Sequence, residues 1–218
     1  MTHADPAVHG PNLTYEYALR DTGCALIAGL DEAGRGAWAG PVVAAAVMLP
    51  IQRFDLAQIL VGVRDSKRMT PLQRETWYAR IFDVALAIGV GEASAHEIDE
   101  AGLIASTRLA MLRALDKLKI KPQHLLLDHI RLPQQELPQT PITRGDGCTL
   151  TIAAASVVAK VARDRAMIAN EAMYPGYGFA QHKGYGTRFH HQALQQLGPC
   201  PIHRKSYAPV AAQCLTED

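Results

Sequence analysis

Residues 27–41 read I-A-G-L-D-E-A-G-R-G-A-W-A-G-P, and this stretch decides the fold. An apolar approach ends in two adjacent carboxylates, Asp31 and Glu32. A glycine-rich turn that carries Arg35 follows, and residues 42–49 form a second apolar run. Apolar runs on either side of a glycine turn indicate two strands of a hairpin, although the alanines of 42–49 also allow a helix there. Carboxylates at the end of a buried strand are costly unless a cation neutralises them, so the stretch predicts a cation beside the two acids.

The composition indicates one domain in a reducing compartment. The chain has 218 residues, 48% of them hydrophobic, which is enough to bury a core; we expect a flexible, polar leader over residues 1–22 and a single domain over 23–218. A net charge of +1 gives no overall basic field, so nucleic-acid binding would need a local basic patch. Four scattered cysteines argue against a disulfide framework.

The start of the chain lacks the features of a signal peptide, and the longest apolar run is too short to span a membrane. We therefore expect a cytoplasmic protein. No heptad pattern or exposed apolar stripe calls for assembly, which predicts a monomer.

Strand and helix patterns alternate along the chain, which predicts an α/β fold. Thr70 and Gln73 form a capping box around Pro71, which indicates a helix start. The prolines of 131–141 indicate a loop, and 142–144 a short strand. The other expected elements are strands over 25–31, 42–49, 88–95 and 125–127, and helices over 72–86, 104–118, 149–173 and 187–197.

Four acids stand at the ends of apolar segments or in glycine turns: Asp31, Glu32, Asp128 and Asp146. Each alone is most simply a turn residue or a helix cap. Together they can meet, because strand ends converge on one edge of an α/β sheet. Carboxylates that meet repel one another unless a cation is bound, and Mg²⁺ or Mn²⁺ suits oxygen ligands. Two such ions serve phosphodiester cleavage, so the acids point to phosphoryl chemistry.

Two further groups of residues suit a nucleic-acid ligand. Glycines in Gly34-Arg35-Gly36 let the backbone approach a ligand closely, although a tight hairpin turn needs the same residues. The basic and aromatic segments 182–188 and 203–207 suit a nucleic-acid backbone, or else form a solvated loop with buried tyrosines. Lys67 is a candidate phosphate contact.

A second basic cluster lies late in the helix expected over 149–173. Lys160, Arg163 and Arg165 could add phosphate contacts, but they are more simply interpreted as a solvated helix face on which Asp164 pairs locally.

The motifs, in order, resemble the bacterial ribonuclease HII family, of the type 2 ribonucleases H. The resemblance runs from about residue 25 to 210, and its motifs are D-E-A-G-R-G at 31–36, D-S-K at 65–67, G-D at 145–146, A-A-S-V-V-A-K-V-A-R-D at 154–164, H-K-G-Y at 182–185 and H-R-K-S-Y at 203–207. It implies a ribonuclease H-like fold with a central mixed sheet flanked by helices and a small helical C-terminal part over roughly 174–218. It also implies Mg²⁺- or Mn²⁺-dependent cleavage of RNA in RNA–DNA hybrids, and nicking 5′ of ribonucleotides embedded in duplex DNA.

The resemblance also implies roles for individual residues. The metal-binding and catalytic carboxylates of the family correspond to Asp31, Glu32, Asp128 and Asp146. The turn that reads the 2′-hydroxyl corresponds to Gly34, Arg35 and Gly36, and the tyrosine that packs on the sugar beyond the junction corresponds to Tyr185.

Two positions depart from the family pattern. His129 stands where the family more often has glycine, and Arg144 replaces a lysine. Neither change removes a carboxylate, so we expect an active enzyme. The alternatives are a nuclease of the same fold with another substrate, such as ribonuclease HIII or a junction resolvase, and a non-catalytic module that binds hybrids. The four acids argue against the last.

Overall fold

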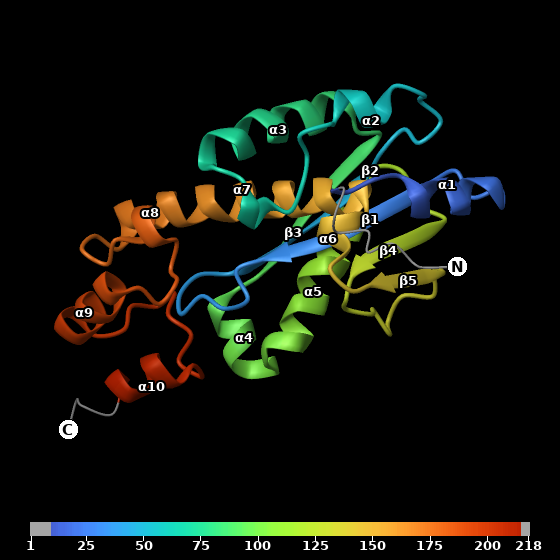
Figure 1. Ribbon diagram of the computed structural model, residues 1–218. Coiled ribbons are helices and arrows are strands. Elements are labelled where there is room, and N and C mark those ends of the chain that lie inside the picture. Colours follow the sequence, from blue (N-terminus) through green and yellow to red (C-terminus); the bar gives the residue numbers. More distant parts are fainter. Residues whose placement is uncertain (1–9, 215–218) are drawn as a thin grey trace, which may run out of the picture.

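A five-stranded mixed sheet forms the centre of the molecule in this computed structural model, which describes residues 10–214 (Figure 1). The strand order is β3-β2-β1-β4-β5; β1 to β3 are antiparallel neighbours, whereas β4 runs parallel to β1, and β5 parallel to β4. The strands are β1 (Ile27–Ala33), β2 (Val42–Met48), β3 (Ala87–Ala93), β4 (His124–Asp128) and β5 (Gln139–Ile142). The hairpin that the sequence pattern predicted and the mixed sheet that the family resemblance implied are both confirmed.

Helices cover both faces of this sheet, with α7 on one face and α5 on the other (Figure 1). The alternation of side chains along β2 explains this arrangement, because Ala45 and Val47 pack toward α7 while Ala44 and Ala46 pack toward α5. The helices are α1 (Thr14–Asp21), α2 (Leu56–Ile59), the 3₁₀ helix η2 (Ser66–Arg68), α3 (Pro71–Val84), α4 (Ala95–Ala101), α5 (Leu103–Asp116), α6 (Gly145–Cys148), α7 (Leu150–Met173), α8 (Phe179–His182), α9 (Arg188–Leu197) and α10 (Ala208–Cys214).

The helix starts follow the capping residues. Thr70 and Gln73 form the predicted capping box of α3, and Ser94 forms another with Glu97 at the start of α4. Thr187 caps α9, which agrees with the helix predicted over 187–197. None of the helices in the described part of the chain has the length and apolar character that a membrane span requires.

Two predictions about loops are wrong. Residues 139–141 belong to strand β5 and not to a loop; Pro141 fits there because β5 lies at the edge of the sheet, where a missing N–H breaks no inner ladder. Residues 10–22 are not a loose leader, since α1 packs on the core through buried Leu13 and the buried carboxylate of Glu16. The rest of the predicted leader, 1–9, lies outside the described residues.

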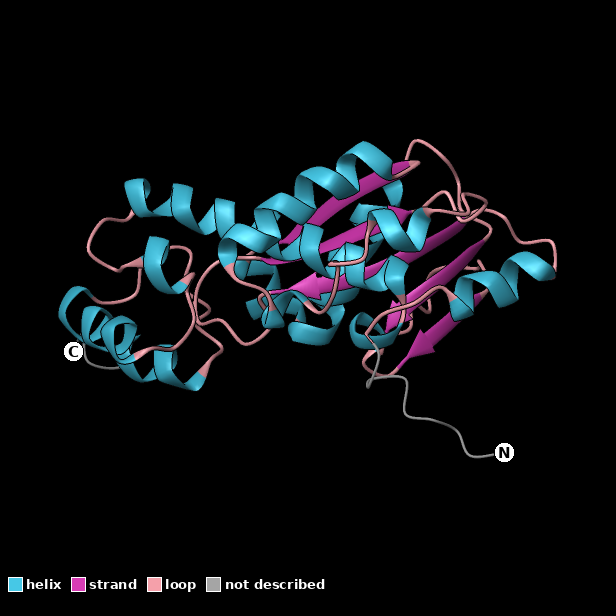
Figure 2. Ribbon diagram, turned by 45° about the horizontal axis from the view of Figure 1, so that its top comes forward, coloured by secondary structure: helices cyan, strands magenta, loops and turns pink. Residues whose placement is uncertain are grey.

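Over its described residues, 174–214, the C-terminal part contains helices and loops without a strand, and it lies beyond one end of the sheet (Figure 2). Its attachment to the hairpin is direct, because Ala37 forms a bridge with Tyr185 and Ala39 forms another with His203. The predicted helical part over 174–218 is therefore present as α8, α9 and α10, and residues 215–218 lie outside the described range. The end of β1 and the C-terminal part together surround the site described next.

Candidate active site

Two carboxylates stand side by side at the ends of the parallel strands β1 and β4. Leu30 pairs with Leu127 in the parallel register, so the residues that follow them, Asp31 and Asp128, are neighbours. Asp31 is buried, and Asp128 is half-buried. The sheet therefore brings together two acids that lie 97 positions apart in the chain.

Asp146 reaches the same place from α6, the single helical turn after β5. The backbone N–H of Gly145 donates to Oδ1 of Asp128 over 2.8 Å, which fixes the turn against the end of β4. Carboxylate oxygens of Asp31, Asp128 and Asp146 all lie within 4.8 Å of one another. Three acids at this spacing form a group that can hold a hard divalent cation.

The surroundings of these acids fit such a cation. Oδ2 of Asp31 and Oε2 of Glu32 are buried and have no hydrogen-bond partner within the described residues. Burial, together with the neighbouring carboxylates of Glu32 and Asp128, raises the pKa of Asp31 well above its usual value. Burial and Asp128 likewise raise the pKa of Asp146. A bound divalent ion would satisfy the oxygens and remove this repulsion.

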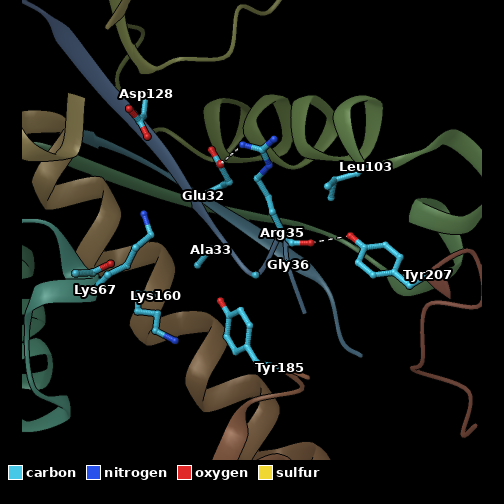
Figure 3. Close-up of a pocket in the computed structure, with 12 residues that line it drawn as sticks. Glu32, Ala33, Arg35, Gly36, Lys67, Leu103, Asp128, Lys160, Tyr185 and Tyr207 are labelled. Carbon is cyan, nitrogen blue, oxygen red and sulfur yellow. Dashed lines mark hydrogen bonds and ion pairs between the residues drawn. The ribbon is translucent and has the colours of Figure 1, made fainter. Parts of the chain in front are cut away.

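Two cations partly offset the negative charge. Arg35 pairs with Glu32 at 3.2 Å, and Lys67 with Asp146 at 3.4 Å. Partial burial disfavours the charged form of Lys67, but the carboxylates of Asp31 and Asp146 prevail and raise its pKa. Glu32 stands apart from the group of three aspartates, because its carboxylate turns toward Arg35 (Figure 3).

Seven of the nine predicted site residues line one pocket of about 630 Å³ (Figure 3). They are Glu32, Gly34, Arg35, Gly36, Lys67, Asp128 and Tyr185. Asp146 lines the adjoining pocket together with Asp128 and Lys67, and Asp31 lies buried among them. The structure thus brings all nine residues to one region.

The aromatic ring of Tyr185 lies at the edge of this pocket. The Lys160 ammonium is 5.3 Å and the Arg163 guanidinium 5.2 Å from the ring centre, which keeps the ring between the glycine turn and α7.

In the cluster on α7, Arg165 is exposed, Lys160 and Asp164 are partly buried, and Arg163 is buried. Asp164 pairs locally with Lys160 at 2.7 Å and also with Arg74 at 3.5 Å, so its predicted pairing is confirmed. Arg163 is fully buried, and the prediction that it lies on a solvated face is wrong. Burial lowers the pKa of Arg163 to about 10, which leaves the guanidinium charged at neutral pH.

The segment 203–207 likewise contains both buried and exposed side chains. His203 and Arg204 are buried and cannot face a nucleic acid, whereas Lys205 is exposed and Tyr207 lines the pocket. Arg204 donates to the carbonyls of Gly34 and Arg35 in the glycine turn, a role that could not be predicted because a run of basic residues does not show which of them points inward. The contact between Ser156 and Ser66, 3.0 Å between hydroxyl oxygens beside the acids, was missed as well.

Comparison with known proteins agrees with this geometry. The family model described as Ribonuclease HII matches residues 28–210. Curated relatives named Ribonuclease HII include one from Chloroflexus aurantiacus, 48% identical over 94% of this chain and 97% of the relative, and one from Moorella thermoacetica, 49% identical over 88% and 91%.

Solved structures show the same fold. The ribonuclease H2 of Pyrococcus horikoshii OT3 is similar with a TM-score of 0.68 and 26% identity, covering 86% of this chain and 96% of its own. A structure of Bst-RNase HIII in complex with Mn²⁺ has a TM-score of 0.68 at 16% identity, covering 91% of this chain and 72% of its own.

The mixed sheet and the acidic group at the ends of β1 and β4 define a nuclease of the ribonuclease H class, a phosphodiester hydrolase whose acids can bind a divalent metal. Within that class, the chain belongs to the ribonuclease HII family.

Proposed function

We propose that this ribonuclease H endonuclease cleaves the RNA strand of RNA–DNA hybrids and nicks duplex DNA on the 5′ side of a single embedded ribonucleotide. The products would be 3′-hydroxyl and 5′-phosphate ends. One observation carries the proposal: the acidic group and the turn Gly34-Arg35-Gly36 meet at one pocket, so a strand held by the turn presents its phosphodiester to the acids.

Asp31, Asp128 and Asp146, with Glu32 as a fourth ligand, would hold Mn²⁺ or Mg²⁺. The bound metal supplies an activated water and stabilises the leaving oxygen. The protein's own part is to present carboxylates whose burial leaves them in need of a cation. Because the site is acidic, it repels a phosphate until that cation is present, which predicts strict metal dependence.

The residues around the acids would select the substrate. The 2′-hydroxyl is the local feature that separates RNA from DNA, so the turn that approaches the strand must contact it. Tyr185, held beside that turn, would pack on the next sugar, and Lys67 at the rim would contact a phosphate. We also propose that the enzyme works as a single catalytic domain, as a monomer and in the cytoplasm.

A direct assay tests this function. We expect the metal-free protein to leave a DNA duplex with one ribonucleotide intact, and Mn²⁺ or Mg²⁺ to induce one nick immediately 5′ of the ribonucleotide, mapped on a denaturing gel. Asp31→Asn should lower the nicking rate at least about a hundredfold while the duplex is still bound, because one metal ligand is lost. The exposed acid Asp116 offers a control, since Asp116→Asn should nick normally. Nicking by Asp31→Asn at the normal rate would show the metal assignment to be wrong.

A further inference from the structure

Arg204 is a fully buried cation whose hydrogen bonds converge on the glycine turn. Its guanidinium donates to the carbonyls of Gly34 at 2.7 Å, of Arg35 at 2.8 Å and of Gly40 at 2.9 and 3.0 Å. The fifth donor reaches the hydroxyl of Tyr207 at 3.0 Å. All five N–H groups of the guanidinium are thus used, and four of them hold the backbone of the turn.

The charge of Arg204 has no carboxylate partner among the described residues. Arg163 is buried in the same way and donates to the carbonyls of Pro41, Ala39 and Lys183. Burying an arginine without a counter-ion is costly, and a neutral donor could brace a loop with less cost. The charge therefore calls for an explanation beyond loop bracing.

The carbonyls that Arg204 holds determine where the neighbouring N–H groups point. In a planar trans peptide the C=O of one residue and the N–H of the next point in opposite directions. Because the carbonyls of Gly34 and Arg35 turn inward to Arg204, the N–H groups of Arg35 and Gly36 turn outward. Within residues 10–214 neither N–H donates a hydrogen bond, and both residues line the pocket.

We propose that Arg204 is a positioning residue for substrate selection: it orients the peptides of the turn so that the N–H groups of Arg35 and Gly36 donate to the 2′-hydroxyl oxygen of the ribonucleotide. The positive charge behind the two carbonyls also polarises the peptides and makes their N–H groups stronger donors. Tyr207 assists, because its hydroxyl donates to the carbonyl of Arg35 at 2.6 Å. This inference rests on the proposed function, to which it adds the residue that sets the reading geometry.

The test compares two duplexes of one sequence, one with a single ribonucleotide and one of DNA only. Their affinities are measured by fluorescence anisotropy in EDTA, where no cleavage occurs. In Arg204→Lys the charge stays but the fork of donors is lost. We expect the preference of this variant for the ribonucleotide duplex to fall about tenfold, which is the effect of losing about one to two hydrogen bonds. Its affinity for the DNA duplex should stay within about twofold of that of the unmodified protein.

Two further variants separate positioning from general stability. Met111→Ala removes a buried side chain of α5 on the opposite face of the sheet from α7, so it should lower the melting temperature and leave the preference unchanged. Tyr207→Phe removes one bond to the Arg35 carbonyl and should lower the preference by about two- to threefold without unfolding the turn. If Arg204→Lys does not fold, Tyr207→Phe decides alone.

The outcomes are distinguishable from one another. A folded Arg204→Lys that keeps the full preference, or that loses affinity for both duplexes equally, overturns the positioning role. An unchanged preference in Tyr207→Phe overturns it as well when Arg204→Lys does not fold. If the unmodified protein nicks 5′ of the ribonucleotide when Mn²⁺ or Mg²⁺ is added, the proposed function stands whatever the variants show. If it neither nicks there with metal nor prefers the ribonucleotide duplex in EDTA, that function is refuted instead.

Discussion

At the scale of single residues, the two glycines of the turn have different reasons to be glycine. Gly34 has φ +95°, and a Cβ there would lie 1.9 Å from Nε of the buried Arg163. Gly36 is exposed, and a Cβ there would meet nothing within 4 Å. The first glycine is required by the fold, whereas the second leaves the backbone open to a ligand.

This difference predicts that replacing glycine by alanine impairs stability at position 34 and activity at position 36. Gly34→Ala should lower the free energy of unfolding by about 3 kcal/mol, because it combines left-handed strain with a clash against a buried cation. Gly36→Ala should change stability by no more than about 0.5 kcal/mol but slow nicking at a ribonucleotide about tenfold, because its methyl group occupies the approach of the strand. Urea unfolding and initial nicking rates check both. Similar nicking by Gly36→Ala and the unmodified protein would count against close approach at this position.

Much of the site was predictable at this scale, and one part was not. Asp31 and Asp128 could be predicted because an acid that ends an apolar run is unusual, and Asp146 because it stands between two glycines in a turn. The supporting role of Arg204 could not, because it depends on the side-chain direction of a residue about 170 positions from the turn that it holds. His129 and Arg144 flank the acids with φ of 62° and 56°, which no residue pattern around them indicates.

At the scale of elements, α7 links the core to the site, and α1 holds its start. Oε1 of Glu16 accepts from the N–H of Thr151 at 2.9 Å and from its hydroxyl at 2.6 Å, so a side chain from α1 caps the first turn of α7. Asn12 adds backbone bonds to Cys148 and Leu150. These contacts lie directly after Asp146, so α1 stabilises the turn that carries this acid.

We expect Glu16→Ala to lower the free energy of unfolding by about 2 kcal/mol, since two buried donors of Thr151 lose their acceptor. The matched control is Glu100→Ala, because Glu100 is exposed on α4 and its removal should cost no more than about 0.5 kcal/mol. Urea unfolding at pH 7 measures both changes. Equal effects of the two substitutions would mean that α1 does not cap α7.

The elements themselves were predicted where local signals are strong. The capping box of α3 and the apolar run before Asp128 act within a few residues, so sequence reveals them. Helix α1 was missed because it is defined by the distant partner Thr151. Strand β5 was expected over 142–144 but spans Gln139–Ile142, because it carries a proline that only an edge position tolerates.

At the scale of the whole molecule, three buried histidines connect the C-terminal part to the site. The nitrogen Nδ1 of His190 faces the carbonyl of Tyr185 at 3.0 Å and therefore carries its proton, which leaves Nε2 as an acceptor. His203 accepts at Nδ1 from the N–H of Cys200 and so donates from Nε2 to His190 over 3.0 Å. His182 accepts from the N–H of Gly184 and donates to a carbonyl. The bonding is complete only when all three rings are neutral.

This arrangement predicts how stability depends on pH. Burial lowers the pKa of His190 and of His203 to about 4, below the value of about 6.5 in an unfolded chain. As the pH falls from 7 toward 4, the unfolded state therefore binds protons that the native state does not, so stability decreases over this window. The shift corresponds to about 3 kcal/mol for each ring, and the loss ends near pH 4, where the native rings also become protonated.

Other groups also titrate between pH 7 and 4. The prediction therefore compares the pH dependence of stability of the unmodified protein with that of a variant without the two histidines. The raised pKa of Asp31 has the opposite sign, because it favours the native state as the pH falls. In the double variant His190→Asn with His203→Asn, asparagine at 190 keeps a donor toward the Tyr185 carbonyl and neither side chain titrates. Urea unfolding at pH 7.5, 6 and 5 should show a steeper loss of stability for the unmodified protein than for the variant. Parallel pH profiles would mean that the two rings take up protons over the same pH range in the native and unfolded states, which would contradict the pKa values lowered by burial.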